Sequence, residues 1–419
     1  MGLLNRALYG EIFKIFPVPA DPNHRWISRL DYVENPEIVK DTLYGKVIRE
    51  AIPVYLSLVK EGIRTGDYSQ ADNFLEGLKQ NQLRYSKMLI PSETKIKAEL
   101  WYNKINVFEQ LFQAYLYVSL LLFTVLVLAV FSSKRLYNRL LTIGKTLLWL
   151  FFIAHTAGLI VRWYISGHAP FSDAYESMIY VAWSTMGAGL LFGRRSWWAL
   201  ASTSFVSSML LMIAHWNWLD PSIGTLQPVL NSYWLMLHVA VIVGSYGPFA
   251  LGAILGALSM LLMIFTTIKN RDKVHVVLKE LLIVNELSLT VGLVMLTIGN
   301  FLGGMWANES WGRYWAWDPK ETWALISILV YATVAHLRLV PFFRNAYLYH
   351  TAVLWAFSVI VMTSYGVNYY LVGLHSYATG DPVPIPSWVY ATVAFLVIVS
   401  VFAYFKYRGL PQEAQKRLF

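Results

Sequence analysis

The sequence contains no cysteine. A chain without thiols cannot form a disulfide, exchange thiols, bind an iron–sulfur cluster or hold haem through thioether bonds of its own. If thiols take part in its chemistry, a substrate or a thiol-reducing partner has to bring them.

Charged residues are also scarce. They make up 14% of the 419 residues, whereas 56% are hydrophobic, and soluble domains carry about 25% charged residues. Apolar runs of about 20 residues, enough to cross a bilayer, recur from Tyr115 to the C-terminus. The formal net charge of +9 comes mostly from basic residues in short loops, which indicates membrane topology and argues against nucleic acid as a partner. We therefore expect an all-α polytopic membrane protein.

About nine transmembrane helices are expected within a membrane domain that covers 113–406, followed by a tail at 407–419. Their predicted bounds are 115–132, 146–165, 176–193, 197–214, 235–267, 281–302, 321–340, 347–372 and 388–406. The run 235–267 is longer than a bilayer requires, so it should tilt or project from the membrane.

Basic residues cluster in alternate connections, and this pattern predicts which side faces the cytoplasm. The clusters contain Lys134, Arg135, Arg139, Lys145, Arg194, Arg195, Lys269, Arg271, Lys273, Lys279, Arg338, Arg344, Lys406, Arg408, Lys416 and Arg417. The other connections, at 166–175, 215–234, 303–320 and 373–387, should then lie outside.

The first 112 residues differ from the rest because they are polar, with helical segments predicted around 36–60 and 68–87. The same orientation places this region outside as a small exported helical region. The stretch from Met1 to Pro17 has no long apolar core of the kind a signal peptide needs. Such a region fits the downstream part of a longer polyprotein, or a chain that works beside a membrane partner.

Five tryptophans crowd into the predicted outer loop 303–323. A loop of flat aromatic side chains suits a large planar apolar ligand, and an interfacial aromatic belt is the alternative. At the end of this loop, Asp318, Pro319 and Glu321 fit the N-cap, N1 and N3 positions of a capping box that opens a helix. The sequence from Trp306 reads Trp-Ala-Asn-Glu-Ser-Trp-Gly-Arg-Tyr-Trp-Ala-Trp-Asp-Pro-Lys-Glu-Thr-Trp.

Histidines lie on both sides of this loop. His238 and His375 fall near the outer ends of their spans, at about the depth of the tryptophans. Two imidazoles at that depth can supply both axial ligands of a haem iron, although each alone also fits a helix-end histidine. His336 and His155 lie within predicted spans, where an ionisable group is a functional candidate; for His336 the alternative is an interfacial histidine.

A polar outer loop from Arg162 to Ser177 is the third notable segment. Asp173 and Glu176 fit a second capping box. The loop is either a connector or a surface that contacts the ligand site or a partner.

The segment Trp306–Trp323 resembles the tryptophan-rich WWD signature of haem-handling proteins, and its form is most similar to the CcsA (ResC) family of cytochrome c synthases. The stretches 162–177 and 371–378 agree, and the resemblance covers about 113–405. It is weak to absent in 1–112, where fused CcsB–CcsA proteins carry an extra exported region.

The resemblance implies that His238 and His375 ligate haem at the outer face and that His336 ligates a second, intramembrane haem, whose other ligand comes from a CcsB/ResB-type partner. It also implies a haem-contacting set of Trp306, Trp311, Arg313, Tyr314, Trp315, Trp317 and Asp318. Arg313, Lys320 or Arg162 can pair with the propionates, and each is equally explained as a solvated loop charge.

The implied activity is system II cytochrome c biogenesis, in which haem b is exported and presented at the periplasmic face of a bacterial inner membrane, or across an organellar one. As a holocytochrome c synthase, the protein would join haem to the Cys-x-x-Cys-His motif of apocytochrome c, whose thiols add to the vinyl groups. The alternatives are a haem-delivery protein of another cytochrome c maturation pathway, a transporter with an aromatic gate, and a haem-bearing quinone oxidoreductase.

Overall fold

The computed structural model describes residues 13–410 except 20, 22–24, 87–90, 132–134, 216–218, 225–231, 268–269 and 375–384. The chain divides into two compact units, Met1–Lys97 and Ala98–Phe419. Each unit is described by itself.

The first unit joins a short ribbon to helices. The antiparallel strands β1 (Phe16–Pro17) and β2 (Trp26–Ile27) are followed by α2 (Arg29–Glu34), the 3₁₀ turn η1 (Pro36–Ile38), α3 (Thr42–Thr65) and α4 (Ser69–Tyr85). Apolar side chains from the ribbon, α2 and α3 form its small core, so the unit has a hydrophobic interior of its own.

One carboxylate organises the start of α3. Asp41 is the N-cap and accepts hydrogen bonds from the backbone N–H groups of Leu43 and Tyr44 and from the Tyr85 hydroxyl. The hydrogen bond from the Tyr44 N–H, followed by that from Tyr85, lowers the pKa of Asp41 below its ordinary value, because both bonds favour the ionised form.

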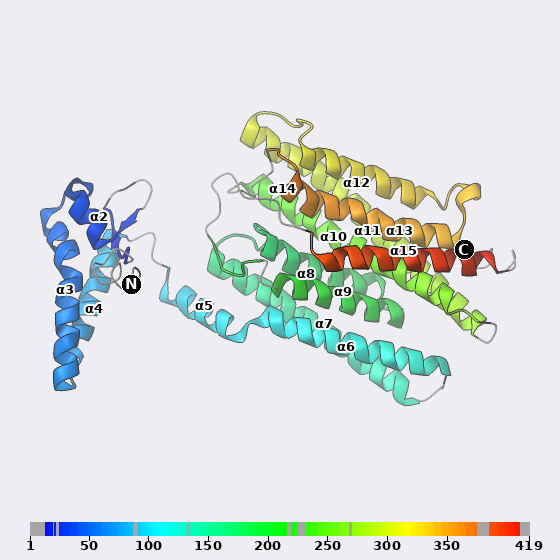
Figure 1. Ribbon diagram of the computed structural model, residues 1–419, viewed down its shortest axis with the longest axis horizontal. Helices are drawn as coiled ribbons and strands as arrows, with labels where there is room; N and C mark the ends of the chain where they lie inside the picture. The colour runs from blue at the N-terminus through cyan, green and yellow to red at the C-terminus, as the bar shows by residue number, and fades with distance from the viewer. Residues whose placement is uncertain are drawn as a thin grey trace. The chain divides into compact units, whose positions relative to one another are not determined.

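The second unit is a bundle of long helices lying side by side (Figure 1). The helix α5 (Glu93–Ile105) crosses the boundary between the units. The elements that follow it, long helices and short turns, are in chain order α6 (Val107–Phe131), α7 (Arg135–Ser166), α8 (Ala174–Phe192), α9 (Trp197–His215), α10 (Tyr233–Ile264), α11 (Arg271–Trp311), α12 (Pro319–His336), η3 (Pro341–Phe343), α13 (Ala346–Val361), the π-helical turn η4 (Met362–Gly366), α14 (Val367–Tyr370) and α15 (Ser387–Arg408).

The all-α polytopic class is confirmed, but the count of nine spans is not. Each predicted span corresponds to a helix, and seven helices in the described part of the chain are long and apolar enough to cross a membrane. The two that do not qualify are α8 and α12, which have 19 and 18 residues. Both carry charge in the first turn, Glu176 in α8 and Lys320 and Glu321 in α12, which lowers their apolar content.

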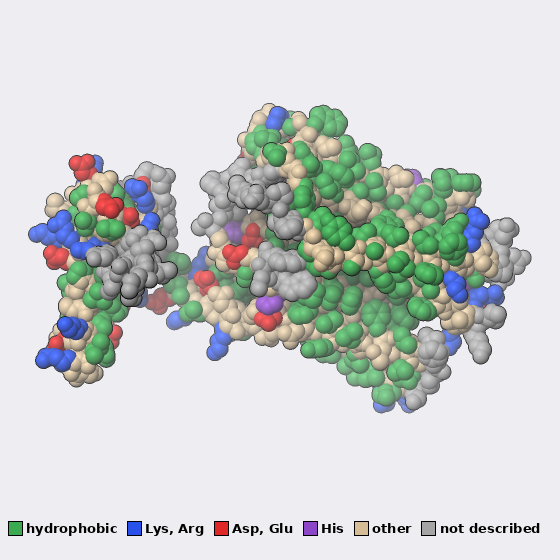
Figure 2. Space-filling view, in the orientation of Figure 1, with side chains coloured by type: hydrophobic (Ala, Val, Ile, Leu, Met, Phe, Trp, Pro, Cys, Tyr) green, Lys and Arg blue, Asp and Glu red, His purple; other side chains and the backbone are tan. Residues whose placement is uncertain are grey.

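Charge is distributed along the bundle as expected for a membrane protein. Hydrophobic side chains cover its middle, and charged side chains gather toward its ends (Figure 2). Successive long helices alternate in direction, so the connections that carry Arg135, Arg195 and Arg338 share one end, here called the basic end. The connection between α11 and α12 lies at the opposite end, here called the tryptophan end.

The helix α10 is the centre of the bundle. Of the 18 consecutive residues that make up its most apolar stretch, 72% are buried. The helix contacts α8, α11, α13 and α15. In its middle, the Phe249 ring stacks on Tyr331 of α12 with centroids 3.8 Å apart. This contact and the packing of α11 against both α10 and α12 fix the relation of the three helices. They carry most of the predicted site residues.

Candidate functional site

The tryptophan segment is not a loop throughout, contrary to the predicted bounds 303–323. Helix α11 continues through Gly303 to Trp311 and ends where Gly312 adopts φ 71° and its N–H bonds to the Asn308 carbonyl. The apolar run stops at Leu302, but the backbone hydrogen bonds of the helix continue beyond it. They end at Gly312, because glycine readily adopts a positive φ. The actual connection is Gly312–Asp318.

Trp306 therefore lies inside the protein, not on an exposed surface. Its side chain is 1% exposed and is stacked nearly parallel to the His238 imidazole, with centroids 6.3 Å apart and an interplanar angle of 12°. Trp311 also meets the Trp306 ring edge-on, with centroids 4.7 Å apart. Trp306 thus limits the positions open to the His238 ring, and Trp311 packs against Trp306.

His238, in the second turn of α10, is held by α11. Its Nδ1 lies 2.7 Å from the Gly299 carbonyl oxygen, and an Nδ1–H that donates there leaves the ring lone pair on Nε2. A Cβ at Gly303 would come within 2.5 Å of the imidazole Cε1, so the absence of a side chain at Gly303 makes room for the ring. Metal-ligating histidines are commonly oriented by such a backbone carbonyl.

Beyond Gly312 the aromatic side chains become accessible. Tyr314 is 60% and Trp317 70% exposed, Trp315 meets Trp317 edge-on at 5.6 Å, and Arg313 is exposed. This part of the predicted haem-contacting set forms an open aromatic surface.

Trp317 adopts an uncommon backbone conformation with φ 58°, which is costly for a bulky residue. Glu321 holds it there. One carboxylate oxygen of Glu321 accepts hydrogen bonds from the N–H groups of Ala316 at 2.8 Å and Asp318 at 3.4 Å, on either side of Trp317. The capping box predicted for this segment is confirmed, and it also keeps Trp317 pointing outward.

Asp318 does more than cap α12. One carboxylate oxygen accepts the Lys320 N–H at 2.9 Å, and the other accepts the Leu374 N–H at 2.6 Å. A Cβ at Gly373 would come within 2.3 Å of this carboxylate. Asp318 is buried and thus ties the start of α12 to the residue directly before His375. His375 itself lies outside the described residues.

A π-helical turn, which sequence reasoning missed, supports the same region. In η4, the Thr363 hydroxyl donates to the Trp323 carbonyl at 3.1 Å, and after it Asn368 accepts a hydrogen bond from the Lys320 ammonium at 2.6 Å. Single π turns inside α-helices occur often at functional sites. No sequence pattern pointed to this one, because the partners lie 40 and 48 residues apart.

The two intramembrane histidine candidates differ. His336 is the last residue of α12, at the basic end; it is exposed, and its Nδ1 lies 2.7 Å from the Ala332 carbonyl oxygen. His155, in α7, is completely buried, with Nε2 3.1 Å from the Ile179 carbonyl oxygen and its ring 5.4 Å from that of Phe108. His155 is thus packed like a residue of the hydrophobic core. His336, in contrast, is accessible to a ligand or a partner.

Arg162 is neither a solvated charge nor placed to meet a propionate, contrary to both alternatives. It is 0% exposed, and its guanidinium donates to Glu176 at 2.8 Å and to the carbonyls of Pro221 and Ser222 at 2.9 and 3.2 Å. The second capping box forms only in part: Asp173 accepts the Glu176 N–H at 2.7 Å, but the Glu176 carboxylate binds Arg162 and Ser172 instead.

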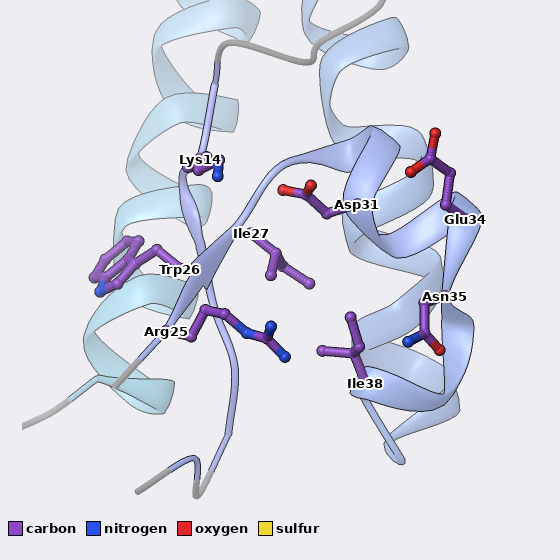
Figure 3. A pocket seen from close by; sticks show the side chains of 8 residues that line it. All are labelled: Lys14, Arg25, Trp26, Ile27, Asp31, Glu34, Asn35 and Ile38. Carbon is purple, nitrogen blue, oxygen red and sulfur yellow. The ribbon is translucent and has the colours of Figure 1, made fainter. Parts of the chain in front are cut away.

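A separate cavity of about 210 Å³ lies in the first unit (Figure 3). Its walls carry charges of both signs, and Ile27 and Ile38 point into it. The lining residues are Lys14, Arg25, Trp26, Ile27, Asp31, Glu34, Asn35 and Ile38. None of the predicted site residues belongs to this cavity.

Comparison with known proteins adds to this geometry. The family model described as "Cytochrome C assembly protein" matches 171–375, a range that contains His238, the tryptophan segment, His336 and His375. The chain is 37% identical to the cytochrome c biogenesis protein CcsA of Synechococcus sp. (strain CC9902), over 53% of this chain and 82% of that protein. It is 33% identical to CcsA of Prochlorococcus marinus (strain MIT 9301), over 59% of this chain and 87% of that protein.

The match to protein NrfI of Wolinella succinogenes is 43% identical over 91% of this chain. The second unit, 98–419, is a smaller fraction of the chain than the part that matches, so the match extends into the first unit. The chain spans only 42% of the length of NrfI.

Proposed function

Because the chain belongs to the CcsA family of cytochrome c biogenesis proteins, we propose that it binds haem b as a substrate at the tryptophan end and presents it to apocytochrome c for covalent attachment. One observation carries this proposal. His238 has its Nδ1 against the Gly299 carbonyl and its ring along Trp306, beside the exposed aromatic connection Gly312–Asp318. A fixed imidazole next to a flat apolar surface suits an iron porphyrin.

The residues divide into three roles. His238 and His375 are the axial ligands of the iron, and Tyr314, Trp315 and Trp317 contact the ring. Trp306 and Trp311 buttress His238, and Arg313 is the exposed cation available to a propionate. Asp318 acts through the Leu374 N–H as a positioning residue for His375, which replaces its predicted role as a direct haem contact.

In the attachment step, each thiol of the Cys-x-x-Cys-His motif adds across a haem vinyl group. One S–C bond forms per vinyl, the thiol proton moves to the other vinyl carbon, and the histidine of the motif replaces one of the two protein ligands. The reaction needs no cysteine of this chain, and the chain has none. The protein contributes orientation and proximity, and a thiol-reducing partner keeps the substrate cysteines reduced.

His336 belongs to a second, inner haem position in the same proposal. It lies at the far end of α12 from Asp318, and over 18 residues at about 1.5 Å each the two are roughly 25 Å apart. One haem cannot touch both. His336 is exposed, so a CcsB/ResB-type partner can supply the other ligand of an inner haem from outside this bundle.

The proposed location is the bacterial cytoplasmic membrane, with the basic end inside and the tryptophan end at the periplasmic face; an organellar membrane is the alternative. Basic residues gather at one end of the bundle in the manner of cytoplasmic loops. The periplasmic face is where exported apocytochromes c are present.

Co-expression of the full chain with a CcsB-type partner and a reporter apocytochrome c tests the function. Haem-stained reporter and a haem spectrum of the purified complex are expected. A haem-free complex that matures no reporter would contradict the proposal, and a haem-containing complex that matures none would reduce it to haem delivery.

A further inference from the structure

A second cavity, of about 460 Å³, opens toward the basic end of the membrane unit. Residues from α11, from the end of α12 and from the connection to α13 line it: Glu286, Ala335, Arg338, Leu339 and Arg344. None of these residues has a role in the proposed outer haem site.

The charges in this cavity do not balance. The Arg338 guanidinium contacts both carboxylate oxygens of Glu286. Arg344 donates its Nε–H to the Arg338 carbonyl at 3.0 Å and has no acidic partner within the described part of the chain. Two guanidinium groups and one carboxylate therefore line the cavity, which leaves one positive charge in excess among its lining residues. Arginine in such a position favours an oxyanion.

The surroundings of the cavity are apolar. Leu339, Val340, Phe342 and Phe343 are all exposed, and the last two meet edge-on at 5.1 Å. An exposed apolar surface beside two guanidinium groups suits a ligand with an apolar body and an anionic edge. A small inorganic anion would leave the apolar part of this surface uncovered.

We propose that this cavity binds the oxyanion of an amphipathic ligand, with Arg344 as its contact and Glu286 as its competitor for Arg338. Under the proposed function, on which this inference rests, the ligand is haem b and the oxyanion is a propionate. His336, the proposed ligand of the inner haem, ends α12 two residues before Arg338 and does not itself line the cavity. The phosphate of an anionic lipid headgroup is the other source of the same chemistry.

The test uses the complex of the full chain with its CcsB-type partner in phosphatidylcholine nanodiscs. The chain carries His238→Ala and His375→Ala, which remove both proposed outer ligands. Haem b and haem dimethyl ester, which lacks free carboxylates, are titrated into this protein and into the same protein with Arg344→Gln. Arg195→Gln is the matched control, because Arg195 is exposed at the same end and does not line the cavity. Thermal unfolding of every variant verifies that it is folded.

Arg344→Gln should weaken haem binding about tenfold, the low end for a charge-assisted hydrogen bond near solvent. It should leave binding of the dimethyl ester unchanged, and Arg195→Gln should change neither. Glu286→Gln should tighten haem binding about threefold, because it removes the competitor for Arg338. If the outer-ligand variant binds haem and the dimethyl ester equally well, with or without Arg344→Gln, the propionate assignment is overturned.

A lipid arm separates the two sources. If Arg344→Gln leaves haem binding intact but lowers the amount of phosphatidylglycerol that copurifies, the oxyanion is a lipid phosphate. If neither haem nor phosphatidylglycerol responds, the cavity is not an anion site, and the proposed function is unaffected. The same titration is made with the complex that retains His238 and His375. If that complex binds no haem but phosphatidylglycerol still responds to Arg344→Gln, the haem function fails and the anion site stands.

Discussion

Replacing Asp318 by asparagine tests the link between the tryptophan segment and the chain before His375. The two carboxylate oxygens of Asp318 accept the N–H groups of Lys320 and Leu374 at 2.9 and 2.6 Å. Asparagine keeps one oxygen for the cap but turns an NH₂ donor toward the Leu374 N–H. The bond to Leu374 is then lost, and two donors face each other in a buried place.

The size of the effect follows from the bond that is lost. A hydrogen bond to a charged group contributes about 1.5–3 kcal/mol, and every 1.4 kcal/mol is about tenfold in an equilibrium constant. Haem affinity at the outer site should therefore fall about 10-fold to 100-fold. The assay is a haem titration of the purified full chain, monitored by its visible spectrum, together with the yield of haem-stained reporter cytochrome.

Asp173→Asn is the matched control, because Asp173 also caps a helix and accepts the N–H of the residue three positions later. It has no bond to Leu374, so haem affinity should stay near that of wild type. Imidazole should partly restore haem binding to Asp318→Asn, since a ligand of the same chemistry can replace a misplaced His375. Unchanged affinity in Asp318→Asn, or an equal loss in Asp173→Asn, would refute the positioning role.

Three further predictions follow from the contacts of single residues. Gly303→Ala should lower haem affinity about 10-fold to 100-fold, because its Cβ would lie 2.5 Å from the His238 ring; the haem titration measures this. Arg162→Gln should cost about 3–5 kcal/mol of stability, because it leaves a buried Glu176 carboxylate without its partner; thermal unfolding measures this. The folded-state pKa of Asp41 lies below its ordinary value near 3.8, so its stabilising contribution is present above that value and is lost as pH falls through the lowered pKa. The protection of α3 amides against hydrogen exchange, relative to the unfolded chain at the same pH, should therefore fall more on acidification in wild type than in Asp41→Asn.

Each of these has a control. Gly304→Ala should be milder than Gly303→Ala, since its Cβ would meet only the Tyr314 carbonyl, at 3.2 Å. If the Arg162→Gln protein keeps its stability but binds less haem per folded molecule, Arg162 contacts a propionate after all. If the α3 amides lose the same protection on acidification in wild type and in Asp41→Asn, groups other than Asp41 determine how the stability of α3 depends on pH.

Hydropathy located the long helices but not where they end. The apolar run 281–302 predicted one span, whereas α11 extends from Arg271 to Trp311. The apolar content of a sequence indicates where contact with lipid ends. The helix itself continues until its backbone hydrogen bonds are interrupted. Gly312 after Trp311 is a C-terminal stop that was visible in the sequence.

Local chemistry at the site was predictable, and contacts between distant segments were not. The capping box of Asp318 and Glu321 depends on residues three apart, and the structure has it. The bond from Asp318 to Leu374 joins residues 56 apart, and that from Arg162 to Pro221 joins residues 59 apart. Such pairs depend on how helices pack, which one sequence does not encode as a pattern.

The most direct test of haem ligation by His238 and His375 is reporter cytochrome maturation by alanine variants of the full chain with its partner. His238→Ala, His375→Ala and the double variant should each mature no reporter, and added imidazole should partly restore maturation, because it fills the vacated axial position on the iron. Full maturation by the double variant without imidazole would contradict the account.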